Sequence, residues 1–546
     1  MSRILRLTVV LAMLVAPGYS GTVDSPQAKE VSRTKPAARR ASALVVEGAA
    51  ALERGDAITA KKLLRSALAI DPTNFTARSY LGIIADQSGQ LGEAERQFAA
   101  AATAAPSSPE ARNNHGAILL KLGRKQQAAA EFEASLRLNP NQAGALVNLG
   151  QIRFDGGTPQ NLRLAQALFE RAHRLARDPE IARALIVVAL RLHEPQQAEK
   201  EFPEYTELQA KAPESLRSSK ARGELGSALL EAGLAKQAVV ELDAAVKGAP
   251  SDVKNIVLLA RAYQQQKDLP GAGHTLESAI ARGVQAAPIY ATLADVYKAT
   301  GHVENAIPAM HRATQLDPKS EAYRFRYAML LTDTLAPQAA VIRLQEALSE
   351  FPDSSRLWFA MGLAQFQDNK NEAAAKAFSH ALALDPKMCP ALAYLGMIDV
   401  DLGKIPEAID QYQKALAIDE RSAVQHYLIA EAWTKLTPPD NGRTEEHLRR
   451  ALVLDPQFQQ AHLALGKLYF RTNRLPEAVA ELEAVVKADP KLAEAYYQLG
   501  RAYMRVKRKE DAQAAMTKFE QLSSTEKEQS ENERRDIVRR LADIRF

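Results

Sequence analysis

Cysteine is nearly absent from the 546-residue sequence, in which Cys389 is the only one. A single thiol excludes an intrachain disulfide, a four-cysteine zinc site and a cysteine-bound iron–sulfur cluster. The ten histidines include no His-x-x-x-His pair on a helix pattern. His426, His447 and His462 come nearest to a cluster, but isolated histidines on helices are usually solvated. We therefore expect no metal site and no cofactor.

An excess of charge of one sign is also missing from most of the chain. Seventy lysines and arginines oppose 65 acidic residues, which gives a net charge of +5. The first forty residues hold seven bases and two acids and so account for the whole excess. A neutral body lacks the strong positive field that duplex nucleic acid requires, and we expect no nucleic-acid partner.

Long apolar runs are absent except at the amino terminus. Two arginines precede the run Leu7–Ala16, and small residues follow it at Gly18 and Ser20. This pattern predicts a signal peptide over 1–20, cleaved near Ser20, and a mature protein that is periplasmic or secreted. An uncleaved signal anchor is the alternative. Residues 21–40 are small, polar and basic, and we expect them to form a flexible basic leader.

Proline recurs with a period of 34 residues. The period is marked by Pro72, Pro106, Pro140, Pro179, Pro213, Pro250, Val284, Pro318, Pro352, Pro386, Glu420, Pro456 and Pro490. Nine of these twelve steps are 34 residues long, and the others are 39, 37 and 36. A period of this length is the signature of a solenoid of helix–turn–helix repeats.

Residue size follows the same period. In each unit a glycine or alanine stands before the marker, in most units by 24 residues, as at Gly116, Gly362 and Gly466. A second alanine follows twelve residues later, and a bulky apolar residue such as Phe132 or Phe378 four residues after that. Two antiparallel helices approach closely only where side chains are small, so this pattern predicts tightly paired helices.

The repeat resembles the tetratricopeptide repeat (TPR) family, in an exported bacterial form, over about residues 41–526. The resemblance implies an all-α, right-handed superhelical solenoid of about fourteen units. We expect irregular units at 155–161, where a loop is inserted, at 194–213, where the second helix lengthens, and at 437–444. After the last unit, Thr525 and Glu528 have capping-box spacing. The segment 527–546 is then predicted to be a helix that caps the last repeat.

Forty residues before the array and twenty after it leave no room for a catalytic domain of ordinary size. No strand pattern is present, and the glycine-containing turns do not follow strands as a phosphate-binding loop would. We therefore expect a protein that is not an enzyme and has no catalytic residues.

In the tetratricopeptide family the first helix of each unit lines a concave groove, and the resemblance implies which residues face it here. The predicted partner-binding residues are Phe325, Phe359, Phe366, Met397, Tyr427, Lys467, Phe470, Tyr497, Arg501 and Arg505. Aromatic residues, methionine and arginine are typical anchors of protein interfaces. The alternative is that these side chains only pack against the neighbouring unit.

We expect a scaffold that binds a peptide or helix of a protein partner, in cell-envelope assembly or secretion. The alternative is a periplasmic spacer or adaptor in polysaccharide export, for which a tryptophan-rich groove would be expected. The two tryptophans, Trp358 and Trp433, occupy positions that belong to the core in the family, which weakens that alternative.

Overall fold

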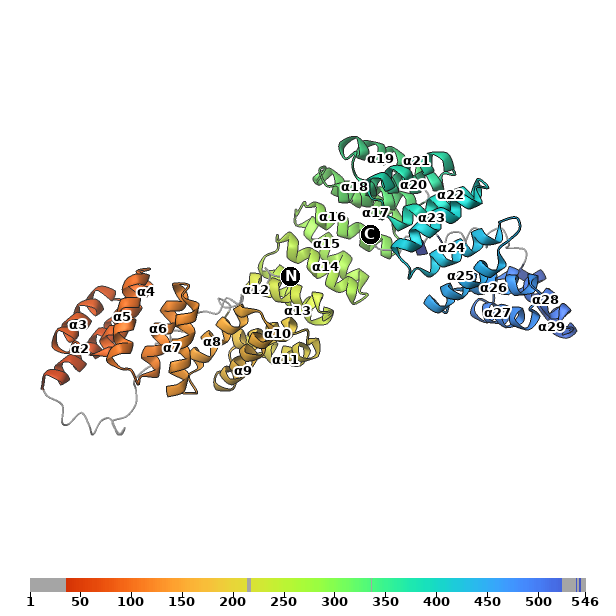
Figure 1. Ribbon diagram of the computed structural model, residues 1–546. Helices are drawn as coiled ribbons and strands as arrows, with labels where there is room; N and C mark the ends of the chain where they lie inside the picture. The colour runs from red at the N-terminus through yellow and green to blue at the C-terminus, as the bar shows by residue number, and fades with distance from the viewer. Residues whose placement is uncertain (1–35, 214–217, 335, 523–536, 538–539, 542–546) are drawn as a thin grey trace. The chain divides into compact units, whose positions relative to one another are not determined.

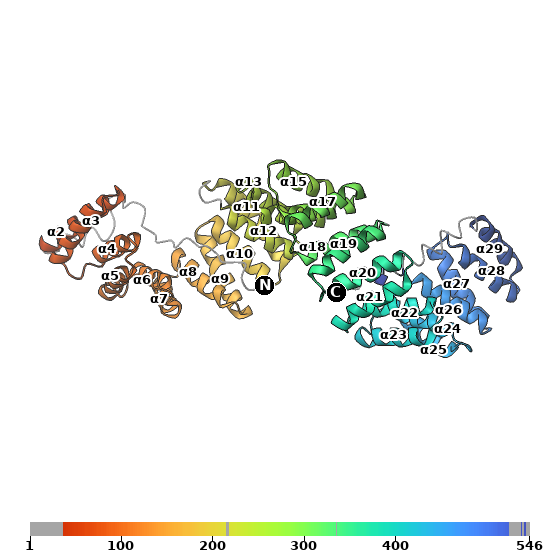
Figure 2. The ribbon, with the colours of Figure 1, turned by 90° about the horizontal axis from the view of Figure 1, so that it is seen from above.

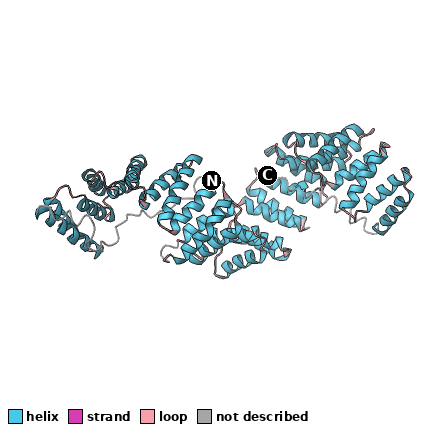
Figure 3. Ribbon diagram, turned by 90° about the horizontal axis from the view of Figure 1, so that it is seen from below, coloured by secondary structure: helices cyan, strands magenta, loops and turns pink. Residues whose placement is uncertain are grey.

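The computed structural model describes residues 36–213, 218–334, 336–522, 537, 540 and 541. Within these residues all regular structure is helical, and Figure 3 shows the helices following one another without a strand. The 28 helices of this part of the chain form fourteen pairs in chain order, which confirms the predicted all-α helical solenoid. None of the described helices is both long enough and apolar enough to cross a bilayer. The predicted signal peptide lies outside the described residues.

The chain divides into two compact parts, Met1–Val296 and Tyr297–Phe546. The first contains α2 (Pro36–Glu53), α3 (Ala57–Ile70), α4 (Phe75–Gln87), α5 (Leu91–Ala104), α6 (Pro109–Lys121), α7 (Lys125–Leu138), α8 (Ala143–Gly156), α9 (Pro159–Leu175), α10 (Pro179–Arg191), α11 (Pro195–Lys211), α12 (Ser219–Glu231), α13 (Ala235–Gly248), α14 (Val253–Gln265) and α15 (Leu269–Ala281). The division falls within α16 (Ala287–Ala299).

The second part continues with α17 (Val303–Leu316), α18 (Glu321–Asp333), α19 (Pro337–Glu350), α20 (Ser355–Gln367), α21 (Asn371–Leu384), α22 (Cys389–Asp401), α23 (Ile405–Ile418), α24 (Ala423–Thr434), α25 (Asn441–Leu454), α26 (Gln459–Arg471), α27 (Leu475–Ala488), α28 (Ala493–Arg505) and α29 (Lys509–Leu522). Even-numbered helices are the first and odd-numbered helices the second of repeats one to fourteen. Figures 1 and 2 show successive pairs stacked side by side within this part.

Each helix pair closes where the sequence places its small residue. A Cβ atom added at Gly362 would lie 2.6 Å from the ring of Phe378, and one at Gly466 would lie 2.8 Å from Leu482. Both bulky partners are completely buried and come sixteen residues after the glycine. The predicted pairing of a small residue with a bulky one is confirmed, and it forms the core of each repeat.

The proline-containing turns end the second helices by a recurring set of hydrogen bonds. At the end of α21, the Asp385 N–H donates to Ala381 O, and the Asp385 carboxylate accepts the N–H of Lys387. Asp455 ends α25 in the same way. Because proline follows each of these aspartates and cannot continue the helix, the chain turns into the next repeat.

Two boundaries differ from the sequence prediction. Helix α2 begins at Pro36, inside the predicted leader, because proline is favoured in a first turn and the following residues are good helix formers. The loop predicted over 155–161 shrinks to Gly157 and Thr158, since Gly157 adopts a left-handed conformation and Thr158 caps α9. The additional residues instead lengthen α9 to 17 residues.

The other two irregular repeats keep their helices. Helix α11 has 17 residues, as the sequence predicts, and runs without a break through Pro203. In repeat twelve, Asp440 caps α25 by accepting the N–H of Arg443. Thr444 replaces the usual alanine and is fully buried, and its hydroxyl donates to the Asp440 carbonyl at 2.7 Å. A polar side chain therefore fits this close-packed position because its hydroxyl is satisfied within its own helix.

Candidate partner-binding surface

All ten residues predicted to line the groove lie on the first helices of repeats nine to fourteen. Three of the side chains are buried, four are half-buried and three are exposed. In that order they are Phe325, Phe359 and Phe366; Met397, Tyr427, Lys467 and Phe470; and Tyr497, Arg501 and Arg505. Because a partner reaches exposed side chains without rearrangement, the accessible part of this set lies at its carboxyl-terminal end.

The buried aromatic residues belong to the core. The ring centroids of Phe359 and Phe366 lie 6.0 Å and 5.4 Å from that of Tyr394 in the next repeat. Phe325 is covered by Arg356, whose Cζ lies 4.6 Å from the ring centroid. Phe359 and Phe366, which the sequence predicts to bind a partner, instead lie in the core, because the adjacent repeat already fills the space beside their rings.

An exposed cluster of arginines and aromatic rings joins α26 and α28. The Arg501 guanidinium carbon lies 4.8 Å from the ring centroid of Phe470 and 5.5 Å from that of Tyr497. The Arg505 carbon lies 5.3 Å from the Phe470 centroid. On its other side, Tyr497 packs against Phe519 of α29 with 5.2 Å between centroids. We call Phe470, Tyr497, Arg501 and Arg505 the cation–aromatic patch.

The arginines of this patch are held by neutral groups. Arg501 donates to the amide oxygen of Gln498, and Arg505 donates to that of Asn473 at 2.7 Å. Among the residues that the structure describes, neither arginine forms an ion pair with a carboxylate. A guanidinium that lies over a ring can still present N–H groups at its edge to a carboxylate. The patch therefore has positive charge to offer a partner.

Lys467, in contrast, is already paired within the chain. Its ammonium forms an ion pair with Glu494 of the next repeat. Glu431 is a second acidic neighbour, and burial raises the pKa of its carboxyl while the charge of Lys467 opposes that shift. Lys467 and Arg501 are both predicted partner-binding residues, and of the two only Arg501 has no carboxylate partner among the described residues.

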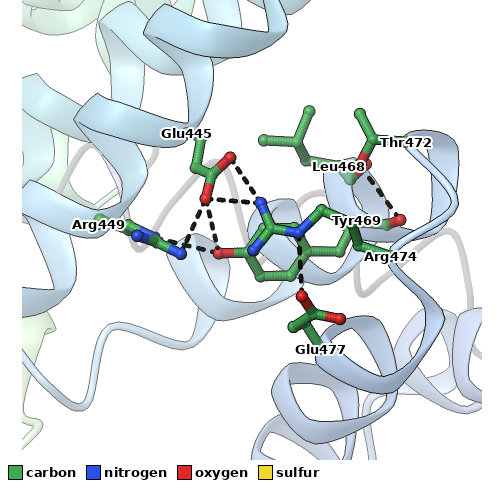
Figure 4. Close-up of polar contacts among 7 residues, drawn as sticks. All are labelled: Glu445, Arg449, Leu468, Tyr469, Thr472, Arg474 and Glu477. Carbon is green, nitrogen blue, oxygen red and sulfur yellow. Dashed lines mark hydrogen bonds and ion pairs between the residues drawn. The ribbon is translucent and has the colours of Figure 1, made fainter.

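A polar network joins repeats twelve and thirteen (Figure 4). Arg474 donates to both carboxylate oxygens of Glu445 at 2.8 and 2.9 Å and lies 4.2 Å above the ring of Tyr469. Arg449 bonds to Glu445 and to the Tyr469 hydroxyl, at 2.9 and 3.2 Å. Arg474 also donates to Glu477 of α27 at 3.1 Å. Burial alone would raise the pKa of the Glu445 carboxyl, but its bonds to Arg474 lower it overall.

The same arrangement recurs one repeat later. Arg508 lies 4.2 Å above the ring of Tyr503 and donates to Glu483 and to Asp511, at 3.1 and 2.6 Å. The Tyr503 hydroxyl donates to the Glu483 carboxylate at 2.6 Å. The sequence prediction missed both networks, although the tyrosines and the arginines each recur 34 residues apart and could have revealed them. The two networks support α26 and α28, the helices that carry the patch.

The histidines and the cysteine show no second site. His426 and His447 come together, with 2.9 Å between their Nδ1 atoms, but His462 bonds instead to Glu481. Within the described residues no three metal-binding side chains converge. Cys389 is buried at the start of α22, and burial raises the pKa of its thiol.

Comparison with protein families agrees with this architecture. Family models described as tetratricopeptide repeat or TPR repeat match residues 51–118, 113–161, 287–320, 336–388, 467–506 and 493–525. These matched segments of the chain are similar to tetratricopeptide repeats. Tetratricopeptide repeats are scaffold folds, and the array is accordingly non-enzymatic. The last two matched segments contain the whole cation–aromatic patch.

Individual relatives are distant. Anaphase-promoting complex subunit 3 of Schizosaccharomyces pombe is 22% identical over 229 residues, which cover 40% of this chain and 33% of the relative. The chain thus spans about a third of the length of the curated relative it matches. A solved structure of the APC/C hetero-tetramer Cut9–Hcn1 is 14% identical, with a TM-score of 0.38 over 85% of this chain and 97% of that one. YrrB, described as a TPR protein with an unusual peptide-binding site, is 23% identical, with a TM-score of 0.29 over 33% of this chain and 91% of its own.

Proposed function

We propose that the array is a scaffold that binds an acidic segment, or the carboxyl terminus, of a peptide or helix at the cation–aromatic patch. The observation that carries this proposal is the exposure of Arg501 and Arg505 over Phe470 without a carboxylate partner among the described residues. Aromatic surface and arginine together supply apolar contact and direction to a bound segment. The repeat fold supports binding of a protein partner in general.

A photo-crosslinking amino acid at Tyr497 tests this proposal in the native cell. We expect a discrete adduct, and we expect Arg501→Glu to remove it, since loss of a binding hot spot costs about 2 kcal/mol or more. Capture by the parent protein should also weaken as salt is raised, because the attraction is partly screened. Arg421→Glu makes the same charge change at an exposed residue away from the patch and serves as the matched control. An adduct that persists in Arg501→Glu and disappears in Arg421→Glu would show that the patch is not the partner-binding site.

We further propose that the mature protein acts outside the cytoplasm, in envelope assembly or secretion. The support is the signal-like segment of residues 1–20. Amino-terminal sequencing of protein from its native cell should give a start near Gly21, or an intact Met1 on membrane-bound protein if the segment remains as an anchor. An intact Met1 on cytoplasmic protein would refute export.

The polysaccharide alternative finds less support in the residues. Trp433 is buried beneath Arg443, whose Cζ lies 4.5 Å from its ring. The Trp358 ring packs against His380, and its Nε1–H donates to the Pro352 carbonyl at 2.8 Å. Both tryptophans are therefore engaged within the chain instead of forming a stacking platform for a sugar ring.

A further inference from the structure

Three described residues near the carboxyl terminus, Ile537, Arg540 and Leu541, lie against the middle of the second part of the chain. The sequence predicts that the carboxyl-terminal segment caps repeat fourteen, but Arg540 forms an ion pair of 2.8 Å with Asp455, 85 residues earlier. Leu541 has no exposed surface and Ile537 is half-buried, and both pack with a core cluster built from α20 to α27. The described residues of this segment thus contact the junction of repeats twelve and thirteen. The rest of the predicted cap, including Thr525 and Glu528, lies outside the described residues.

The receiving site is held by hydrogen bonds that do not involve the carboxyl-terminal residues. The Asp455 backbone N–H donates to Ala451 O, and its Oδ1 accepts the N–H of Gln457. Its Oδ2 is thereby directed to Arg540, whose guanidinium carbon also lies 4.5 Å from the ring centroid of Phe458. An arginine that meets a held carboxylate and a ring together is bound more specifically than by either group alone.

Phe458 places an aromatic ring where three other repeats of this part have a capping serine and where Met388 and Leu492 of two more make no side-chain cap either. The residue before the first helix is Ser320 at α18, Ser354 at α20 and Ser422 at α24, and each serine hydroxyl accepts a backbone N–H as a cap. At α26 the residue is Phe458, which makes no side-chain cap. It is fully buried, and its ring packs 5.2 Å from that of Tyr427, a predicted partner-binding residue. At the point where Arg540 binds, an aromatic ring thus occupies a position that holds a capping serine in three other repeats.

We propose that the carboxyl-terminal segment around Ile537–Leu541 is a tethered ligand of the Asp455–Phe458 junction, and that it competes there with a partner helix of the same pattern. That pattern is an apolar residue, an arginine three positions later and an apolar residue at the fourth. The competition rests on the proposed function only in requiring a protein partner. Fourteen residues separate Leu522 from Ile537, and a short tether gives an effective concentration of about millimolar, which an external ligand must overcome.

A labelled synthetic peptide of residues 530–546 is the probe, and the full-length protein is the receptor. Parent protein should bind it weakly, because its own segment occupies the junction. Leu541→Asp should release that segment without touching the receiving site, and the peptide should then bind about tenfold tighter or more. Equal binding by parent and Leu541→Asp would overturn the proposal. Because this test involves no unknown partner, its failure would leave the test at Tyr497 unaffected.

A charge exchange provides the matched control. In full-length Asp455→Arg the protein's own Arg540 is repelled, so a peptide carrying Arg540→Asp should bind better than the natural peptide. Leu541→Asp protein should show the opposite preference. Identical preferences in the two proteins would show that the peptide binds elsewhere. An unchanged helical signal of both variants in circular dichroism at the assay temperature would confirm that the receptors remain folded.

A bis-maleimide crosslink shows whether the junction binds the carboxyl-terminal segment of its own chain or that of a second copy. The protein carries Asp455→Cys and Arg540→Cys, and Cys389→Ala removes the native thiol. We expect a fast crosslink that leaves the chain monomeric on denaturing gels at every protein concentration. If crosslinked dimers are the main product, the junction binds the segment of a second copy, and the proposal of a tethered ligand is overturned.

Discussion

Helices α20 and α28 are the first helices of their repeats, but equivalent side chains on them differ in how far they are buried. Phe359 and Tyr497 both stand three residues before the small glycine of their repeats. The Phe359 side chain is 2% exposed, whereas that of Tyr497 is 38% exposed. The repeat position thus determines the direction in which a side chain leaves its helix. The next repeat determines whether the side chain is covered, and so whether it serves the core or a partner.

Truncating one aromatic residue in each region should give the largest contrast. We expect Phe366→Ala to lower the free energy of unfolding by about 3–5 kcal/mol, since it leaves a cavity beside Tyr394. Tyr497→Ala should change it much less, because its ring is partly exposed already. Thermal and denaturant unfolding of both variants measures the difference. Equal losses in the two would mean that Tyr497 is a core residue and would remove it from the patch.

An overpacking substitution should have the next largest effect. Gly362→Leu should cost about 1–3 kcal/mol, because its side chain would collide with the Phe378 ring 2.6 Å from the Cβ position. Gly92→Leu is the matched control, since Gly92 also lies in a helix but has no atom within 4 Å of an added Cβ. The melting temperatures of the two variants should differ clearly. If Gly362→Leu melts like the parent, the helix pairs do not close at this position.

Acid should produce the smallest effect, through the histidine pair of repeat twelve. Burial lowers the pKa of both His426 and His447, and the charge of His447 lowers that of His426 further. Arg450 and Arg443 act in the same direction, while Glu446 opposes them.

Both histidines therefore lose their proton at a lower pH in the folded state than in the unfolded state, where a histidine has its ordinary pKa of 6.5. Their stabilising contribution is complete above that pH and is lost as the pH falls below it. We expect the free-energy difference between the parent and His447→Asn to shrink by roughly 1 kcal/mol or less between pH 7.5 and pH 5.5. A difference that grows toward acid pH would contradict the assigned direction.

The sequence predicts what depends on spacing within one repeat. Gly362 and Phe378 could be paired in advance because the period places them on facing helices, and the lengthened α11 follows from counting residues. Contacts between repeats could not be read in this way. The pairing of Lys467 with Glu494 and the burial of Phe366 depend on how closely successive repeats stack.

The contacts of Ile537, Arg540 and Leu541 were also beyond the sequence pattern. The apolar stripe of the carboxyl-terminal segment, which includes Ile537 and Leu541, predicts an amphipathic helix, but the stripe would suit the last repeat as well as any other apolar face. Arg540 determines which apolar face is covered, because it contacts both the Asp455 carboxylate and the Phe458 ring. Such contacts depend on groups distant in sequence, for which periodicity has no signal.

The recurring Tyr469–Arg474 and Tyr503–Arg508 contacts have a consequence for how many repeats unfold cooperatively. A repeat array is stabilised by its repeats and by the joints between neighbours, and weak joints let single repeats open independently. Here, two consecutive joints each combine a stacked arginine with carboxylates from both sides. Repeats twelve to fourteen should consequently exchange their amide hydrogens together, as one cooperative block, so that a partner held on α28 would not detach by fraying of the last repeat.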